Sequence, residues 1–489
     1  MLRSIKRLTK HSAVYGIGHI LSRFVGFLLL PIHTNYLLPE EYGTAALLFS
    51  SLAILNVIFS YGMDVAFLRF FILEDSRMDK QRIFSTAFLM ILCTGICFSS
   101  VMIFYPTPLS RIIFSSGQHS ILIRFAGGIL LADTLGLIPF LVLRGEERST
   151  RFVFLKFLNI AINLGLNILF VVVLRKGVQG IFLSNLIASV FTLGTLLPIL
   201  FHWLRLKFRK DTLSELLRFG LPYIPSGLAV IIMDQIGRFF LDRMMGKEAT
   251  GLFSASYKLG MFMALVVAAF RFAWHPFFLN TSREENAPQI FARVLTYFLT
   301  ITGYIFLVIS TFIGEIIRLN IFGITLFGEE YSSGISIVPI VLLAYIGYGV
   351  YVNFIVGIYL KKKTSILPLV TGAGALVSVG ANFVLIQLFG IIGAAWATFL
   401  AYASMAAVLY KVSHRLYPIP YERSRIFKLF IIVATLFFLL TSVLGNGSVL
   451  LRFCILMLLF PLLWIIRFFN RDEMLAMRRF FLRGDGLSS

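Results

Sequence analysis

A polar turn leads into an apolar run at Pro39-Glu40-Glu41-Tyr42-Gly43-Thr44-Ala45, and a similar turn occurs later as Lys247-Glu248-Ala249-Thr250-Gly251-Leu252-Phe253. In both, a polar acidic segment is followed by a glycine and then by the next apolar stretch. A junction that recurs in this way indicates two copies of one structural unit.

The sequence around these turns is apolar enough to lie mostly within a lipid bilayer. Hydrophobic residues make up 58% of the 489 residues, charged residues 14%, and the mean hydropathy is +0.89. This composition excludes a soluble core with a water-covered surface. A spanning helix needs roughly 20 mostly apolar residues, so we expect about fourteen spans. They lie near 12–37, 42–62, 83–105, 118–143, 152–174, 178–204, 217–241, 251–274, 289–314, 336–360, 365–389, 391–413, 426–444 and 449–468.

A second pair of segments supports the repeat. Asn167, an apolar run and Gly177-Val178-Gln179-Gly180-Ile181 parallel Asn382, an apolar run and Gly390-Ile391-Ile392-Gly393-Ala394, with a spacing that differs by two residues. Each copy holds six spans, so the copies share one orientation about an axis along the membrane normal. We expect an all-α polytopic membrane protein with six-helix bundles at 1–210 and 211–415, and two further helices with a cytoplasmic tail at 416–489.

Lysine and arginine gather in alternate connections between the predicted spans. Cytoplasmic loops retain these residues during insertion, so both termini are expected in the cytoplasm. The basic connections include Arg77, Lys80, Arg82, Arg144, Arg148, Arg151, Arg205, Lys207, Arg209, Lys210, Lys361, Lys362 and Lys363. The net charge of +21 therefore reflects topology and contact with anionic membrane lipids. Nucleic-acid binding would need a basic soluble domain, which the sequence lacks.

Several charged residues fall within or at the ends of predicted spans. A charge at mid-bilayer costs about 2.5–3.5 kcal/mol on insertion scales, so it needs a partner, a water-filled cavity or a substrate. The candidates for binding an anionic substrate in a cationic cavity are Arg23, Arg69, Arg124, Arg238, Lys258 and Arg271. The candidates for ion coupling are Asp64, Asp133 and Asp234, because a buried carboxylate can titrate or hold a cation.

Some of these residues also allow a purely structural interpretation. Asp234 and Arg238 have the spacing of an ion pair within one helix. Arg69 and Arg271 lie near the cytoplasmic ends of their spans and could extend to the headgroups. Arg23 has no acid within its own span. Another polar stripe, in the fifth span, consists of Lys156, Asn159, Asn163 and Asn167.

Three sets of segments resemble the polysaccharide transporter branch of the multidrug/oligosaccharidyl-lipid/polysaccharide (MOP) superfamily, which contains O-antigen and capsule repeat-unit flippases. The first set is Ser22-Arg23-Phe24-Val25-Gly26-Phe27 with Tyr36-Leu37-Leu38-Pro39-Glu40-Glu41-Tyr42-Gly43. The second runs from Asp234 through Gly251-Leu252-Phe253-Ser254-Ala255-Ser256-Tyr257-Lys258-Leu259. The third is Leu360-Lys361-Lys362-Lys363-Thr364 with Asn382 and Gly390-Ile391-Ile392-Gly393-Ala394-Ala395-Trp396-Ala397-Thr398. The resemblance covers nearly the whole chain.

This resemblance implies two six-helix bundles that form a MATE-like V around a cationic cavity. It also implies a cargo: an oligosaccharide on undecaprenyl pyrophosphate, moved from the cytoplasmic to the outer leaflet of a bacterial inner membrane by alternating access. Arg23, Lys258 and Arg238 would then meet the pyrophosphate or acidic sugars. The membrane potential or antiport of H⁺ or Na⁺ would drive transport, no cofactor is expected, and a polysaccharide polymerase or other assembly proteins would be partners.

Other functions remain open at this point. A lipid II flippase and a cation-coupled drug exporter belong to the same superfamily, although export of organic cations fits an excess of cations poorly. A membrane glycan polymerase or ligase is a different class, and such enzymes commonly place catalytic groups in a large external loop. The outer connections here look short, and the sequence has neither a Walker-type motif nor a metal-ligand pattern. We therefore expect a transporter and not an enzyme.

Overall fold

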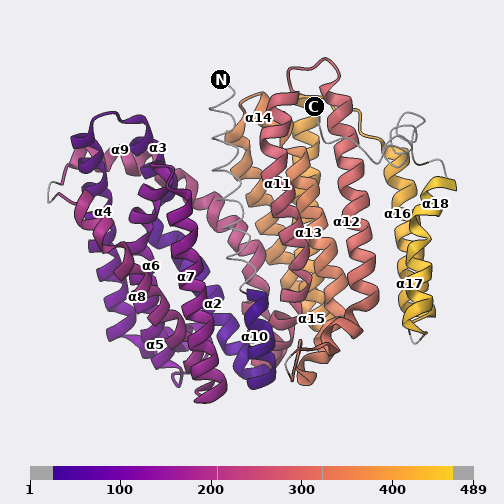
Figure 1. Ribbon diagram of the computed structural model, residues 1–489, viewed down its shortest axis with the longest axis horizontal. Helices are drawn as coiled ribbons and strands as arrows, with labels where there is room; N and C mark the ends of the chain where they lie inside the picture. Colours follow the sequence, from indigo (N-terminus) through magenta and orange to yellow (C-terminus); the bar gives the residue numbers. More distant parts are fainter. Residues whose placement is uncertain (1–25, 206–207, 322, 446, 466–467, 469–489) are drawn as a thin grey trace.

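The computed structural model describes residues 26–205, 208–321, 323–445, 447–465 and 468, and these are almost entirely helical (Figure 1). Within them, the strands are two short antiparallel segments, β1 (Asn320–Ile321) and β2 (Ile324–Thr325). The predicted all-α class is therefore confirmed.

The helices follow the order predicted for a repeated bundle. In the N-terminal half, helical residues 26–36 precede α2 (Pro39–Ser60), α3 (Met63–Leu73), α4 (Arg77–Phe104), α5 (Pro106–Phe114), α6 (Ser120–Gly145), α7 (Ser149–Asn167) and α8 (Gly177–Trp203). The C-terminal half contains α9 (Lys210–Gly220), α10 (Ile224–Gly260), α11 (Phe262–Thr281), α12 (Ala287–Arg318), α13 (Val338–Phe354), α14 (Val356–Leu360) and α15 (Leu367–Leu416). The last described helices are α16 (Arg423–Phe438), α17 (Val449–Met457) and α18 (Leu459–Ile465).

The helix lengths agree with the predicted spans. Eleven helical stretches among the described residues are long and apolar enough to cross a membrane. One of them, Thr364–Leu416, contains two predicted spans, separated at Gly390. The first and last predicted spans correspond to helical residues 26–36 and to the shorter apolar stretch Val449–Ile465, and the rest of the first lies outside the described residues. The chain is a multi-pass membrane protein.

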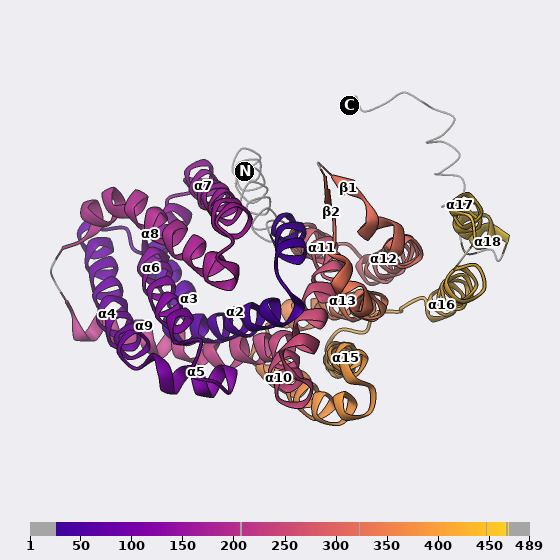
Figure 2. The same ribbon diagram turned by 90° about the horizontal axis from the view of Figure 1, so that it is seen from below.

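The two halves form a V. Figure 1 shows the indigo-to-magenta half and the orange half meeting at the lower end and diverging toward the upper end, with α16–α18 standing to one side. Seen from below in Figure 2, α2 and α10 run side by side where the halves meet, and the two helices pack on each other. We call the upper end, with Arg77 at the start of α4 and the connection 361–363 after α14, the basic side. The lower end is the opposite side.

The boundary predicted between the two bundles, at 210/211, stays a prediction. Just beyond it, α9 packs against α3 and α4 of the N-terminal half. The helical hairpin that follows the second bundle is attached through α12, because buried Arg452 of α17 forms an ion pair with Glu315 and donates to the Thr311 carbonyl oxygen at 3.1 Å.

The two repeated turns pack directly on each other where α2 meets α10. A methyl group added to Gly43 would lie 1.9 Å from the carbonyl oxygen of Lys247, and one added to Gly251 would lie 1.8 Å from that of Pro39. Each added methyl would also lie 3.0 Å from the backbone nitrogen of the other glycine. This reciprocal contact is the one expected from two copies related by a two-fold axis. Only glycine permits such a close approach of two backbones.

The second pair of repeated segments is also equivalent in the structure. Gly177 and Gly390 both adopt a left-handed backbone, with φ of +54° and +57°, where the chain turns into the next helix. Asn167 and Asn382 are both buried, and each donates to a carbonyl oxygen four residues earlier, at 2.9 and 2.8 Å. The predicted six-helix repeat is therefore confirmed.

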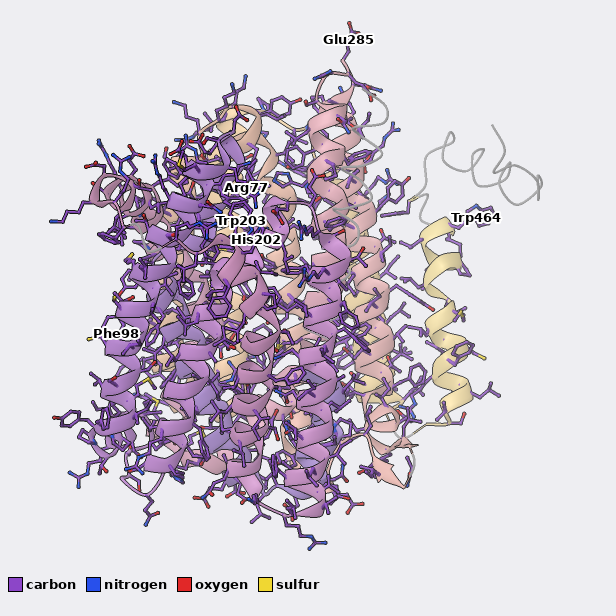
Figure 3. The ribbon with its side chains drawn as sticks, turned by 60° about the vertical axis from the view of Figure 1, so that its left-hand side comes forward. Arg77, Phe98, His202, Trp203, Glu285 and Trp464 are labelled. Carbon is purple, nitrogen blue, oxygen red and sulfur yellow. The ribbon has the colours of Figure 1, made fainter. Side chains whose placement is uncertain are left out.

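The outer surface of the helices suits contact with lipid. Trp464 lies at the outer surface in Figure 3 and is 66% exposed, and Phe98 of α4 is 38% exposed. Toward the basic side, Arg77 of α4 and His202 of α8 lie near each other in Figure 3 and are joined by a 2.9 Å hydrogen bond. Large apolar side chains such as Phe98 and Trp464 on the outer surface are typical of bilayer-spanning helices.

We expect Gly43→Ala to lower the thermal stability of the protein in detergent. The added methyl group would overlap the Lys247 carbonyl and separate α2 from α10, and such overpacking commonly costs about 1–3 kcal/mol. Gly165→Ala is the matched control, because nothing lies within 4 Å of a methyl group there and alanine favours a helix. A melting temperature for Gly43→Ala equal to that of Gly165→Ala would contradict the close contact.

Candidate functional site

A cavity of about 490 Å³ lies between the two halves and is lined by the first helix, α2, α7, α8 and α10. Three cations line it, namely Lys156 of α7 with Arg238 and Lys258 of α10, and none of its described lining residues is an Asp or Glu. We call it the cationic cavity. A low-dielectric cavity with several positive charges and no lining carboxylate favours an anionic ligand.

Arg238 is only 7% exposed, and its charge is not neutralised by the neighbouring acid. Its Nη1 donates to the backbone carbonyl of Asp234 at 2.7 Å and to Gln235 Oε1 at 3.0 Å. The ion pair that the spacing of Asp234 and Arg238 allows is not among the ion pairs of the described residues. The guanidinium lies 4.9 Å from the centroid of the Tyr257 ring, which stabilises the cation without cancelling its charge.

The two lysines of the cavity also lie against aromatic rings. Lys258 Nζ is 5.3 Å from the centroid of the Tyr42 ring, and Lys156 Nζ is 4.3 Å from that of Phe140. In the part of the chain that the structure describes, neither forms an ion pair within 4 Å, although the Asp133 carboxylate is close enough to attract Lys156 electrostatically. The stripe predicted in the fifth span contributes Lys156, Asn159 and Asn163 to this cavity.

His33 also lines the cavity but is not among the residues predicted from the sequence. His33 is 2% exposed, its Nε2 lies 3.0 Å from Asn167 Oδ1, and its Nδ1 has no hydrogen-bond partner among the described residues. His33 falls within the first predicted span. The search for charged residues within spans would therefore have found it if histidine had been included. Gln235, which accepts from Ser50 at 2.8 Å, was missed because a polar uncharged side chain is a weaker signal.

Asp234 lies outside the cavity lining and connects three helices of the C-terminal half. Its Oδ1 accepts hydrogen bonds from the hydroxyls of Tyr257, Tyr345 and Tyr402, at 2.8, 2.9 and 3.4 Å. Its Oδ2 accepts from Gln235 Nε2 at 3.0 Å. The network joins α10 to α13 and α15.

The structure brings only part of the predicted site together. Arg238 and Lys258 meet in the cationic cavity, whereas Arg23 lies outside the described residues. Arg69 is exposed, with its guanidinium 4.3 Å from the centroid of the Phe219 ring, and Arg124 is exposed near the start of α6 on the opposite side. Neither residue lines the cavity. The sequence could not show this, because a hydropathy pattern gives the depth of a residue in the membrane but not the direction that its side chain faces.

Arg271 and the two remaining acids also lie elsewhere. Arg271 is exposed, donates to the Tyr348 hydroxyl at 3.1 Å and lines a different cavity in the C-terminal half. Asp64 is exposed in the first turn of α3, and Asp133 is exposed on α6. Their coupling roles stay predictions.

The halves are held together on the opposite side by polar contacts. Tyr331 donates to the Leu37 carbonyl at 2.9 Å, and the Gly328 amide donates to Thr34 Oγ1 at 3.1 Å. Lys247 Nζ lies 3.1 Å from His119 Nε2, which joins α10 to the connection before α6. The V is therefore closed on the opposite side and spread on the basic side (Figure 1).

Comparisons with known proteins agree with this architecture. Residues 8–282 match the model of a family described as polysaccharide biosynthesis protein. A protein of the Lsg locus of Haemophilus influenzae is 22% identical over 373 residues, which cover 70% of this chain and 85% of that protein.

Two solved structures share the fold. One is described as lipid II flippase MurJ in an inward closed conformation, with a TM-score of 0.70, 14% identity and coverage of 96% of this chain and 99% of that chain. The other is a multidrug resistance MATE family transporter of the MOP superfamily in an inward-facing conformation, with a TM-score of 0.63, 17% identity and coverage of 84% and 96%. At these identities the similarity concerns the fold alone, and it confirms the predicted MATE-like arrangement.

We expect Asp234→Asn to destabilise the protein more than Tyr345→Phe does. The first change weakens every hydrogen bond to the carboxylate, whereas the second removes one, and single interhelical hydrogen bonds in membranes average about 0.6 kcal/mol. Thermal unfolding in detergent measures the order. Tyr402→Phe, which removes the longest of the three bonds, should have the smallest effect, and an Asp234→Asn protein as stable as wild type would refute the network.

We also expect closure of the opposite side to weaken in acid. Burial, and then the Lys247 ammonium, lower the pKa of His119 from its ordinary value of 6.5, while Glu40 opposes them. A lowered pKa means that protonation disfavours this conformation, so its stability falls as pH drops below 6.5 toward the lowered pKa.

Lys247→Gln tests this effect. It should raise the pKa of His119 only in part, because burial remains the largest cause. A histidine NMR titration, assigned with His119→Gln, measures the pKa, and an unchanged value in Lys247→Gln would show that the ammonium does not act on the ring.

Proposed function

Because this chain belongs to the polysaccharide biosynthesis protein family, we propose that it moves an oligosaccharide carried on undecaprenyl pyrophosphate from the cytoplasmic to the outer leaflet of a bacterial inner membrane. The observation that supports this most directly is the cationic cavity between the halves, where Lys156, Arg238 and Lys258 converge and no carboxylate is among the lining residues described. A pyrophosphate diester carries two negative charges, and arginine and lysine are the usual donors to phosphate oxygens.

Unpaired polar atoms around the cavity support an occupant that forms hydrogen bonds. His33 Nδ1 and Ser254 Oγ are buried, line the cavity and have no partner among the described residues. Leaving such a group unpaired costs about 1–3 kcal/mol. Because His33 Nε2 donates to Asn167 Oδ1, Nδ1 of the neutral ring is an acceptor, and a sugar hydroxyl would donate to it. The Ser254 hydroxyl would donate to a phosphate or sugar oxygen.

The shape of the molecule supports transport by alternating access. The halves touch on the opposite side and spread on the basic side, so the present conformation faces the basic side. We propose that the basic side and both termini are cytoplasmic, because cytoplasmic loops retain lysine and arginine. The cargo would enter from the cytoplasmic leaflet, and rocking of one half against the other would present it to the outer leaflet.

The driving force is proposed to be the membrane potential or exchange with H⁺ or Na⁺. An inside-negative potential favours outward movement of an anion by about 2.3 kcal/mol per charge per 100 mV. Of the candidate acids, Asp133 is the one whose charge acts on the cavity cation Lys156, so binding of a cation at Asp133 would alter the field in the cavity. Asp234 is the alternative, through its neighbour Gln235.

We propose that the protein is a transporter and not an enzyme, and that membrane lipids and polysaccharide assembly proteins are its partners. The cavity's positive charge disfavours organic cations as cargo. Transport of lipid II is the second candidate, because the fold matches that of a lipid II flippase over 96% of this chain. Both cargoes carry a pyrophosphate, so they differ in the sugars and not in the cationic cavity.

We expect Lys258→Gln and Arg238→Gln each to slow transport of a fluorescent undecaprenyl-pyrophosphate oligosaccharide into the far leaflet of proteoliposomes by about 10- to 100-fold. A charge-assisted hydrogen bond is worth about 1.5–3 kcal/mol, which corresponds to that range. Lys258→Arg should retain much of the rate. The control is Lys361→Gln, an exposed cation on the basic side that lies outside the cavity.

Three outcomes of this assay distinguish the candidate functions. Loss of transport in the cavity variants with normal protein abundance supports a flippase with a cationic cavity. Preference for lipid II over the oligosaccharide cargo would favour the second candidate. Transport of a small organic cation alone would reject both.

A further inference from the structure

A second cavity, of about 760 Å³, lies within the C-terminal half and is lined by α10, α11, α13, α14 and α15. We call it the aromatic cavity and define it by Trp274, Tyr348, Tyr351, Tyr359 and Tyr402. It is separate from the cationic cavity. Met233 lines the aromatic cavity, and Gln235 lines the cationic cavity. Residues two positions apart on a helix point in directions about 200° apart, so α10 lies between the two cavities.

Trp274 has an unpaired donor at this cavity. The side chain is 3% exposed, and its Nε1 has no hydrogen-bond acceptor among the described residues. The indole is held in place by nearly parallel rings, with Phe270 at 5.6 Å and Phe277 at 5.8 Å between centroids. A buried tryptophan N–H normally finds a partner, so Trp274 Nε1 needs an acceptor that the described residues do not supply.

The remaining wall combines flat apolar faces with a few polar groups. Tyr348 and Tyr351 are stacked at 6.0 Å between centroids, and His275 packs edge-on against Tyr359 at 4.8 Å. Arg271 donates to the Tyr348 hydroxyl through Nη1 and keeps its other donors for a ligand. Among the described residues that line this cavity there is no carboxylate.

This combination selects among the parts of a lipid-linked glycan. A pyrophosphate would meet one cation, Arg271, and an isoprenyl chain would leave Trp274 Nε1 unpaired. A sugar ring has apolar C–H faces that pack on aromatic rings and hydroxyl oxygens that accept from an indole N–H or a guanidinium. The volume also falls within the roughly 300–1,000 Å³ of small-molecule sites.

We propose that the aromatic cavity binds the sugar rings of a carbohydrate, at a site distinct from the cationic cavity. The choice of carbohydrate as ligand class rests on the proposed function. Leu279 and Tyr359 line the cavity near the ends of α11 and α14, so it lies toward the basic side, where the cargo is proposed to arrive. The cavity then contributes to selecting which glycan is accepted, whereas the cationic cavity holds the pyrophosphate.

Binding to the purified full-length protein in detergent tests this assignment with two probes. The first is the reducing oligosaccharide released by mild acid from the lipid-linked fraction of cells that lack this protein. The second is inorganic pyrophosphate. Isothermal titration calorimetry should show about tenfold weaker binding of the oligosaccharide to Trp274→Phe, which keeps an aromatic ring but removes the N–H, with pyrophosphate binding unchanged.

The matched control is Trp396→Phe, the same change at an exposed tryptophan of α15 that lines neither cavity. Lys258→Gln should show the converse pattern, with weaker pyrophosphate binding and normal oligosaccharide binding. If Trp274→Phe does not fold, Arg271→Gln replaces it, because Arg271 is exposed and not part of the packed core.

The outcomes separate this proposal from the proposed function. Oligosaccharide binding that is weakened by Trp274→Phe or Arg271→Gln, but not by Trp396→Phe, supports the sugar site even if pyrophosphate fails to bind. Oligosaccharide binding that none of the aromatic-cavity variants alters overturns it. Pyrophosphate binding without any oligosaccharide binding overturns the sugar site and leaves the cationic cavity intact.

Discussion

The contact between Gly43 and Gly251 fixes how the two halves of the molecule meet. With no side chain at either position, the backbones of α2 and α10 approach until each glycine faces a carbonyl of the other helix. The same approach places Lys258 over the ring of Tyr42, the neighbour of Gly43, and lets Ser50 reach Gln235. The cationic cavity forms beside this contact, so the repeated turn determines both the fold and the position of the site.

Aromatic rings, more than acids, surround the cations of this cavity. Tyr42, Phe140 and Tyr257 each lie near one of the three positive side chains. A cation–π contact stabilises a charge by about 0.5–2 kcal/mol but does not neutralise it as a carboxylate would. The positive charge therefore stays available to an anionic ligand. The aromatic contacts stabilise the three cations within the bilayer without ion pairs among the described residues that line the cavity.

The repeat, the helical class and two cavity cations followed from sequence because they depend on local spacing and span length. The other outcomes depend on neighbours far away in the chain. Asp234 has the spacing to pair with Arg238, but tyrosines from α13 and α15 reach its carboxylate instead. Trp274 gave no signal, because in an apolar span a tryptophan that lines a cavity has the same pattern as one that faces lipid.

The location of the glycine contact near one end of the V has a mechanical consequence. In the proposed rocking motion the contact would act as a pivot for long helices: α12, with 32 residues, is about 48 Å long at 1.5 Å per residue. A small rotation at the pivot would then become a displacement of many ångströms at the far ends, while the glycines would hardly separate. The relative stability of the conformations open to the two sides would then depend on a few polar contacts beside this pivot, such as the hydrogen bond from Tyr331 to the Leu37 carbonyl.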